Sequence, residues 1–254
     1  MADEVLTEVA DATLIITLNR PQARNAVDRA TAEQLSAALD RLDEDGDLRA
    51  GILTGAQNTF CAGMDLKAFV KGESPVIEGR GFAGLTEAPP AKPLIAAVEG
   101  YALAGGCEVA LACDLIVAAR GARFGIPEVK RGLVAAGGGL VRLPRRIPSA
   151  IAMELALTGD AIDAERAERL GLVNRVCDDG QAIDVATELA GAITANAPLA
   201  LQASKQIVRE SWNWTEDEWP RRQAPGVQQV MGSQDAIEGS KAFAEKRAPQ
   251  WTGR

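Results

Sequence analysis

Strand-like stretches alternate with helical or glycine-rich segments over the first 120 residues of the chain. The predicted strands are short apolar runs: two within residues 4–21, which meet near Ala10 and Asp11, and one each within residues 49–56, 92–100 and 113–120. A repeated strand–helix–strand order is typical of stacked βαβ units. The chain is therefore predicted to have an α/β fold.

The helical segments have a different periodicity. After the second predicted strand, apolar residues recur at helical spacing, at Leu35, Ala38, Leu39 and Leu42. Asp28 or Thr31 is expected to cap the start of this helix. From about residue 137 the pattern is helical, so this part is expected to dock onto the first part or onto another subunit. The segment 71–93, rich in Gly, Pro and charge, is the best candidate for a mobile loop.

Composition limits the classes of function. With 254 residues, of which 47% are hydrophobic, the chain can fill a substantial core. Its net charge of −8 and its pI of about 4.8 disfavour nucleic-acid binding. Apolar stretches such as 93–106 are interrupted well short of a membrane span, and residues 1–12 are acidic, unlike a signal peptide. We therefore expect a soluble, cytoplasmic protein.

Histidine is absent from the sequence. Its absence excludes Ser-His-Asp triads, HExxH metalloproteases and His–carboxylate metal sites. Cys61, Cys107, Cys113 and Cys177 form no CxxC pair and lie in apolar segments, so we expect buried, reduced thiols and no metal site. Proton transfer is left to carboxylates, Lys, Tyr101, Cys or water, with Glu and Asp favoured once burial shifts their pKa.

The apolar segment AGGCEVALACDL at residues 104–115 carries one acid in its middle, Glu108. Glutamate is seldom buried without a partner. Taken alone, Glu108 is either a functional group or a helix-face acid that points to water or pairs with an Arg. A second acid, Glu128, follows Gly and Pro in RFGIPEVKRG and by itself is most simply a solvated loop residue.

Two glycine-containing turns are expected to present unpaired backbone N–H groups. Gly105 and Gly106 lie at the start of the helix that is predicted to carry Glu108. The turn FCAGMDLK, residues 60–67, likewise follows a strand and opens a short helix at Asp65. Two such N–H groups that converge on one carbonyl oxygen would form an oxyanion hole, although the glycines could also serve only the turns.

Six segments occur along the chain in the order FCAGMDLK, KPLIAAVEGYALAGGCEVALACDLIVAA, ARFGIPEVKRGL, AMELALTGD, AERLGLVNRV and AFAEKR. Together they resemble the successive motifs of the enoyl-CoA hydratase/isomerase (crotonase) family, over essentially the whole chain. The resemblance implies an α/β fold of stacked ββα units with a C-terminal helical trimerisation region. Residues 1–195 would form the acyl-CoA-binding catalytic core, and residues 196–254 the helical oligomerisation region.

The resemblance also implies roles for particular residues. The backbone N–H groups of Met64 and Gly105 would hold the thioester oxygen of an acyl-CoA, and Glu108 and Glu128 would be the paired glutamates of hydratases. The residues implied in binding the CoA substrate are Arg24, Ala62, Asp65, Leu66, Lys67, Phe243 and Lys246. The last two would reach the CoA of a neighbouring subunit in a homotrimer or a dimer of trimers. CoA would be part of the substrate, with no separate cofactor.

Hydration of 2-enoyl-CoA to 3-hydroxyacyl-CoA, as in fatty acid β-oxidation, is the function that these residues favour. Glu128 is assigned as the acid toward Cα, and Glu108 as the base that holds the water. One alternative is a Δ3,Δ2-enoyl-CoA isomerase or another acyl-CoA reaction on the same scaffold, and another is a non-catalytic acyl-CoA-binding protein. Departures from common family patterns leave the acyl-chain preference open; they are Ala135, Ala136, Leu140 and Val141.

Overall fold

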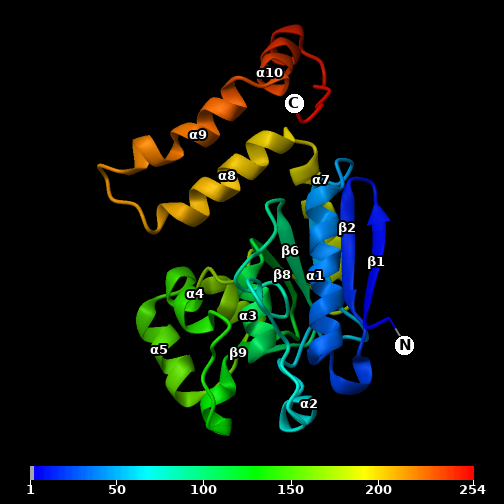
Figure 1. Ribbon diagram of the computed structural model, residues 1–254, viewed down its shortest axis with the longest axis vertical. Helices are drawn as coiled ribbons and strands as arrows, with labels where there is room; N and C mark the ends of the chain where they lie inside the picture. The colour runs from blue at the N-terminus through cyan, green and yellow to red at the C-terminus, as the bar shows by residue number, and fades with distance from the viewer. Residues whose placement is uncertain (1–2) are drawn as a thin grey trace.

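A computed structural model describes residues 3–254 and contains a central six-stranded sheet with the order β1-β2-β3-β6-β8-β11 (Figure 1). Its strands are β1 (Val5–Ala10), β2 (Thr13–Leu18), β3 (Ala50–Gly55), β6 (Leu94–Val98), β8 (Leu115–Ala119) and β11 (Arg175–Cys177). β1 is antiparallel to β2, and the other neighbouring strands are parallel. The α/β prediction is confirmed, but β11 lies in the part that was predicted to be helical.

A second, smaller sheet explains why the repeated unit is ββα rather than βαβ. It contains β7 (Tyr101–Leu103), β9 (Arg123–Gly125) and β10 (Ile162–Asp163), and a bridge between Cys61 and Ala102 extends it beside β7. Each of β3, β6 and β8 is followed by a short segment in this sheet and then by a helix. Strands of three residues are too short to show a period in the sequence. The single strand predicted at 92–100 ends at a bend, where Gly100 has a φ of 57°.

The helices that follow these units are α2 (Leu66–Val70), α3 (Gly105–Ala112) and the 3₁₀ helix η2 (Pro127–Arg131). A short 3₁₀ helix η1 (Pro21–Ala23) precedes α1 (Arg29–Glu44). The Asp28 side chain accepts a hydrogen bond from the Thr31 N–H at 2.9 Å, so Asp28 is the N-cap of α1.

Two helices cover opposite faces of the large sheet. The leucines of α1 belong to the main core cluster together with Leu53 of β3. α7 (Ala182–Thr194) lies on the other face, where Ile52 and Ile95 contact its buried alanines. Adjacent residues of one strand, such as Ile52 and Leu53, therefore point into separate cores. Both faces of the strands are covered, which explains their nearly continuous apolar sequences.

The segment 71–93 is more ordered than the sequence indicated. β4 (Val76–Ile77) and β5 (Gly81–Phe82) form a short antiparallel hairpin. Residues 81–86 are buried, and Phe82 and Leu85 belong to the main core. The prediction of a mobile loop is wrong for this part, because the apolar side chains among its Gly and Pro residues are used for packing.

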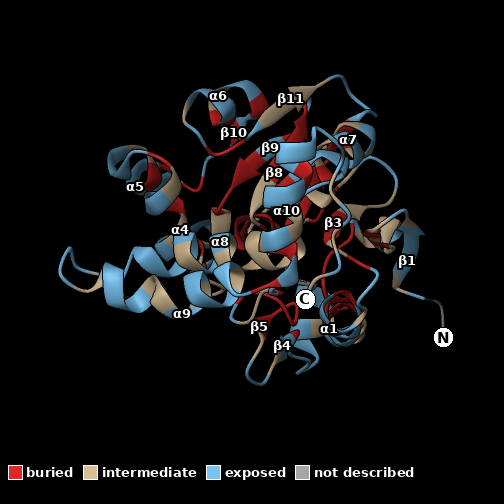
Figure 2. Cartoon of the chain, turned by 90° about the horizontal axis from the view of Figure 1, so that it is seen from above, coloured by how far each residue is buried: buried red, intermediate tan, exposed pale blue. Residues whose placement is uncertain are grey.

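The remaining helices are α4 (Gly139–Arg146), α5 (Ser149–Thr158), α6 (Ala164–Arg169), α8 (Pro198–Ser211), α9 (Trp219–Met231) and α10 (Gln234–Glu245). α8, α9 and α10 extend away from the large sheet, and we call residues 198–245 the terminal arm (Figure 1). Neither α8 nor α9 has a buried residue, and the buried positions gather instead at the sheet (Figure 2). Within residues 3–254, no helix combines the length and the apolar character that a membrane span requires.

Candidate active site

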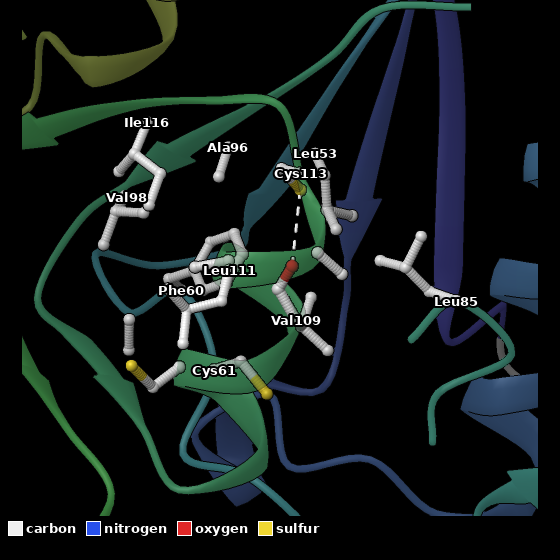
Figure 3. Packing of buried hydrophobic residues seen from close by; sticks show 14 of the residues in the cluster. Leu53, Phe60, Cys61, Leu85, Ala96, Val98, Val109, Leu111, Cys113 and Ile116 are labelled. Carbon is white, nitrogen blue, oxygen red and sulfur yellow. Dashed lines mark hydrogen bonds between the residues drawn. The ribbon is translucent and has the colours of Figure 1, made fainter. Parts of the chain in front are cut away.

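Helix α3 is buried along its entire length. All eight of its residues are buried, and Figure 3 shows Val109 and Leu111 of the helix, and Cys113 directly after it, among apolar side chains of the core. This burial explains why the helix has no polar face. Glu108 is the one charged residue in it, and only 4% of its surface is exposed. A carboxylate in such a place is costly unless specific donors stabilise it.

A donor for Glu108 comes from the start of α4. The Gly139 N–H donates a hydrogen bond to Glu108 Oε1 at 2.8 Å, so the carboxyl group of Glu108 lies at the positive end of that helix. A methyl group on Gly137 would lie 2.7 Å from Glu108 Oε2, and one on Gly139 would lie 3.0 Å from Oε1. The run Gly137–Gly139, which we call the glycine loop, therefore leaves just enough room for this carboxyl group.

The pKa of Glu108 is raised from 4.5 to about 7. Burial is the main cause, and repulsion from Glu128 adds to it. The Gly139 N–H and the positive charge of Arg142 act in the opposite direction, because both stabilise the carboxylate. Glu108 therefore changes its protonation state near neutral pH, where a general base is most useful.

Glu128 is the second carboxyl group of the site and comes from η2. Burial raises its pKa as well. Its Oε2 atom is buried and has no hydrogen-bond partner within residues 3–254. Two carboxyl groups from different elements thus lie in an environment that disfavours the charge on both, and the charge of Glu128 acts on Glu108. Such a pair tends to hold one proton between its members.

A loop that ends at Met64 lies against the start of α3. A methyl group on Gly63 would be 3.0 Å from the Gly105 nitrogen, and one on Gly106 would be 2.1 Å from the Cys61 carbonyl oxygen. Among the described residues 3–254, the Met64 and Gly105 N–H groups donate no hydrogen bond. Two N–H groups from adjacent segments are therefore without an acceptor in this part of the chain, and their convergence on one carbonyl oxygen stays a prediction.

Ala104, which precedes α3, has a φ of 51° and a ψ of −129°. This conformation is strained for a residue with a Cβ atom, whereas glycine adopts it readily. Ala104→Gly is expected to raise the free energy of unfolding by about 1 kcal/mol, because the relieved strain exceeds the added chain entropy. Urea unfolding tests this, with Ala110→Gly inside the helix as a control that should destabilise. Equal losses in both variants would contradict the assignment of strain to Ala104.

Several residues predicted to bind CoA lie close to Met64. The Ala62 N–H donates to the Arg24 carbonyl oxygen at 3.0 Å, which joins the two segments. Leu66 and Lys67 are exposed at the start of α2. Asp65 caps this helix by accepting from the N–H groups of Lys67 at 3.0 Å and Ala68 at 3.2 Å.

Phe243 and Lys246 are not near this site within one chain. Both lie at the end of α10, which the structure places far from α2 and α3 (Figure 1). Phe243 is 88% exposed, and Lys246 ends the helix in a left-handed conformation with a φ of 54°. Neither residue therefore belongs to an element beside α2 or α3 of its own chain, and the predicted role at a neighbouring subunit stays a prediction.

Sequence reasoning missed the residues that hold the site together. The residues that flank the glycine loop were singled out from the sequence but its glycines were not, although three consecutive glycines are a signal of close approach. Arg20 was also missed. Its guanidinium group pairs with Asp28 at 2.9 Å and with Asp65 at 3.0 Å, so it joins the N-caps of α1 and α2. No local pattern marks this contact, because its partners are far apart in the sequence.

Comparisons with known proteins agree with this fold and identify the family. The sequence profile of the family described as Enoyl-CoA hydratase/isomerase matches residues 8–254. The chain is 44% identical to the carnitinyl-CoA dehydratase of Proteus mirabilis and 46% identical to that of Salmonella typhi, in each case over 249 residues that cover 95% of both proteins. Among solved structures, it superposes on an enoyl-CoA hydratase from Mycobacterium tuberculosis H37Rv with a TM-score of 0.98 at 61% identity, covering 100% of both chains. A carnitinyl-CoA hydratase from Mycobacterium avium gives a TM-score of 0.79 at 41% identity with the same coverage.

Proposed function

Because the chain belongs to the enoyl-CoA hydratase/isomerase family, we propose that it hydrates 2-enoyl-CoA thioesters to 3-hydroxyacyl-CoA, the reaction of a hydro-lyase. The observation that carries this proposal is the pair of buried carboxyl groups with raised pKa values, Glu108 and Glu128, together with the Met64 and Gly105 N–H groups, which have no acceptor among residues 3–254. CoA enters as part of the substrate, and no separate cofactor takes part.

Hydration has three chemical requirements. Negative charge that develops on the thioester oxygen must be stabilised, a proton must reach Cα, and a water oxygen must bond to Cβ as the double bond breaks. The N–H groups of Met64 and Gly105 meet the first requirement, and a donor of this kind is worth about 3 kcal/mol in comparable sites. The other two requirements need one protonated and one ionised carboxyl group.

The surroundings of the two glutamates support different roles for them. Glu108 accepts the Gly139 N–H and is favoured as a carboxylate by Arg142, so it serves as the base that removes a proton from water. Glu128 has a buried oxygen without a donor, which favours the protonated form and suits the acid that delivers a proton to Cα. One proton leaves the water and one arrives at Cα, so the thioester gains H and OH in total.

The identity of the acyl group that the proposed site accepts is a separate question from the type of reaction. Relatives of the chain are named for carnitinyl-CoA, whose reaction has the same type of chemistry on a different acyl group. Side chains that follow Glu128 and the glycine loop are apolar and partly exposed; they are Val129, Leu133, Val134, Leu140 and Val141. We propose that these side chains line the acyl site, where they would favour an uncharged aliphatic chain over a charged one.

The absorbance of the conjugated enoyl thioester provides the direct test. With crotonyl-CoA, absorbance should fall as hydration proceeds, and a series of longer 2-enoyl thioesters would rank the acyl groups. Carnitinyl-CoA tests the reverse direction, because loss of water from it would create a conjugated enoyl thioester and raise the absorbance. Migration of the double bond in a 3-enoyl-CoA without hydration would favour the isomerase alternative. Binding of CoA thioesters without any turnover would favour the non-catalytic alternative.

We further propose that the protein assembles as a trimer or a dimer of trimers, with residues 196–254 as the oligomerisation region and residues 1–195 as the catalytic core. The terminal arm supports this, because it exposes large apolar side chains such as Trp212 at 61%, Met231 at 73% and Phe243 at 88%. Surfaces of this kind are normally covered by a partner. In such an assembly, Phe243 and Lys246 would contact the CoA of the adjacent subunit.

Lys246→Ala is expected to raise KM for the CoA thioester several-fold with little change in kcat, because a contact remote from the reacting carbons contributes uniform binding. Steady-state kinetics tests this prediction, and the effect should shrink at high salt, which screens a charge pair. Lys241→Ala, an exposed lysine of the same helix, is the matched control. A stable monomer with full activity in sedimentation experiments would refute the shared site.

A further inference from the structure

One guanidinium group joins the two halves of the site. Arg142 lies on α4, and its Nη1 atom donates a hydrogen bond to the Gly137 carbonyl oxygen at 3.1 Å. Its Nη2 atom donates to the Thr86 carbonyl oxygen, on the segment that follows β5. A methyl group on Gly138 would lie 2.2 Å from Nη1, so the guanidinium group lies directly on the glycine loop.

Each end of this bridge leads to a group in the proposed mechanism. On one side, the glycine loop donates the Gly139 N–H to Glu108. On the other side, the Thr86 N–H donates to the Phe82 carbonyl oxygen at 3.2 Å. The Phe82 ring packs directly against Gly105, since a methyl group on Gly105 would lie only 2.6 Å from the ring. The base and one N–H group of the oxyanion hole are therefore braced through the same side chain.

We infer that Arg142 is a positioning residue that aligns Glu108 with the oxyanion hole through the glycine loop and the segment after β5. The inference rests on the proposed function for its kinetic consequence. Arg142 touches neither of the proposed reacting atoms, and it acts through the glycine loop and through its charge. Positioning of this kind affects kcat more than substrate affinity.

The charges around Glu108 and Arg142 determine in which direction loss of Arg142 shifts the pKa of Glu108. Glu108 faces Glu128 from η2, Arg142 from α4 and the thiol of Cys107 on its own helix. Arg142 in turn faces other cations, namely Arg209 of α8 and Arg145 and Arg146 of α4. Removal of the Arg142 charge leaves the repulsion between the two glutamates with less compensation. The pKa of Glu108 should then rise above its value of about 7.

The inference is tested with Arg142→Gln and Arg142→Lys, and Arg145→Gln is the control that removes an exposed charge from the same helix. Arg142→Gln should raise the midpoint of the acidic limb of kcat/KM by roughly one pH unit and lower kcat about 10-fold, with KM nearly unchanged. Arg142→Lys keeps the charge but loses the bridge, so it should keep the wild-type midpoint and still lower kcat. Arg145→Gln should resemble the wild type in all three quantities.

A measurement without turnover separates this inference from the proposed function. The titration of the Glu108 carboxyl carbon can be followed by ¹³C NMR in the free protein, with Glu108→Gln to assign the signal. A raised Glu108 pKa in Arg142→Gln supports the inference even if the wild type hydrates no thioester, which would refute only the proposed function. An unchanged pKa and unchanged kcat in both Arg142 variants would overturn the inference while hydration by the wild type stands. If Arg142→Gln does not fold, the kcat of Arg142→Lys tests the bridge alone: a lowered kcat supports the inference, and an unchanged kcat overturns it.

Discussion

Replacing either Glu108 or Glu128 by glutamine is expected to lower kcat for enoyl-CoA hydration by roughly 10²–10⁴-fold, the usual contribution of a general acid or base. Glutamine has nearly the same shape, and in Glu108→Gln its carbonyl oxygen can still accept the Gly139 N–H. The local structure should therefore persist while proton transfer is lost. KM for the thioester should stay within a few-fold of the wild-type value, because neither carboxyl group is among the proposed CoA contacts.

Glu8→Gln, on the exposed edge strand β1, is the control for both substitutions and should keep full activity. The two catalytic variants also distinguish hydration from isomerisation. If Glu108→Gln hydrates at a nearly normal rate while Glu128→Gln abolishes double-bond migration in a 3-enoyl-CoA, a single carboxyl group performs the chemistry. The isomerase alternative would then replace the proposed function.

Elements with strong local patterns were predictable from the sequence. β6 is buried at all five positions, and its continuous apolar run identifies it without any tertiary information. α1 has an amphipathic period and an Asp28 cap, both of which are local. The start of α3 was predictable from Gly105 and Gly106, and so was the placement of Glu108 in its first turn. The family motifs then connected Glu108 with Glu128, which spacing alone could not do.

Features that depend on distant contacts were not predictable. The Gly139 N–H that stabilises Glu108 lies 31 residues further along the chain, and the Arg142 bridge reaches back 56 residues to Thr86. Neither contact has a local signature, because each is created by the way the ββα units stack. The hairpin at residues 76–82 was missed for a related reason. Its Gly and Pro content indicates a loop, whereas the burial of Phe82 is decided by its neighbours in the core.

Glu108→Gln is also expected to stabilise the protein above neutral pH. The folded state raises the pKa of Glu108 from 4.5 to about 7, so the folded protein binds this proton more tightly than the unfolded chain does. The contribution of this tighter proton binding to the free energy of unfolding is complete below pH 4.5 and is lost as the pH rises through about 7. At pH 8 the buried carboxylate should therefore cost up to about 3 kcal/mol, and the glutamine variant avoids this cost.

Urea unfolding of the wild type and Glu108→Gln at pH 5 and pH 8, at one fixed protein concentration, measures this effect. The difference between the two proteins should be small at pH 5, where Glu108 is protonated, and should favour the variant at pH 8. Other titrating groups are present in both proteins and largely cancel, and Glu8→Gln should show no such change. A variant that is less stable than the wild type at pH 8 would mean that the Gly139 N–H and Arg142 fully compensate the carboxylate. A variant that is more stable than the wild type at pH 8 would show that the folded protein carries a destabilising charge in its core, as is common where activity requires a charged group.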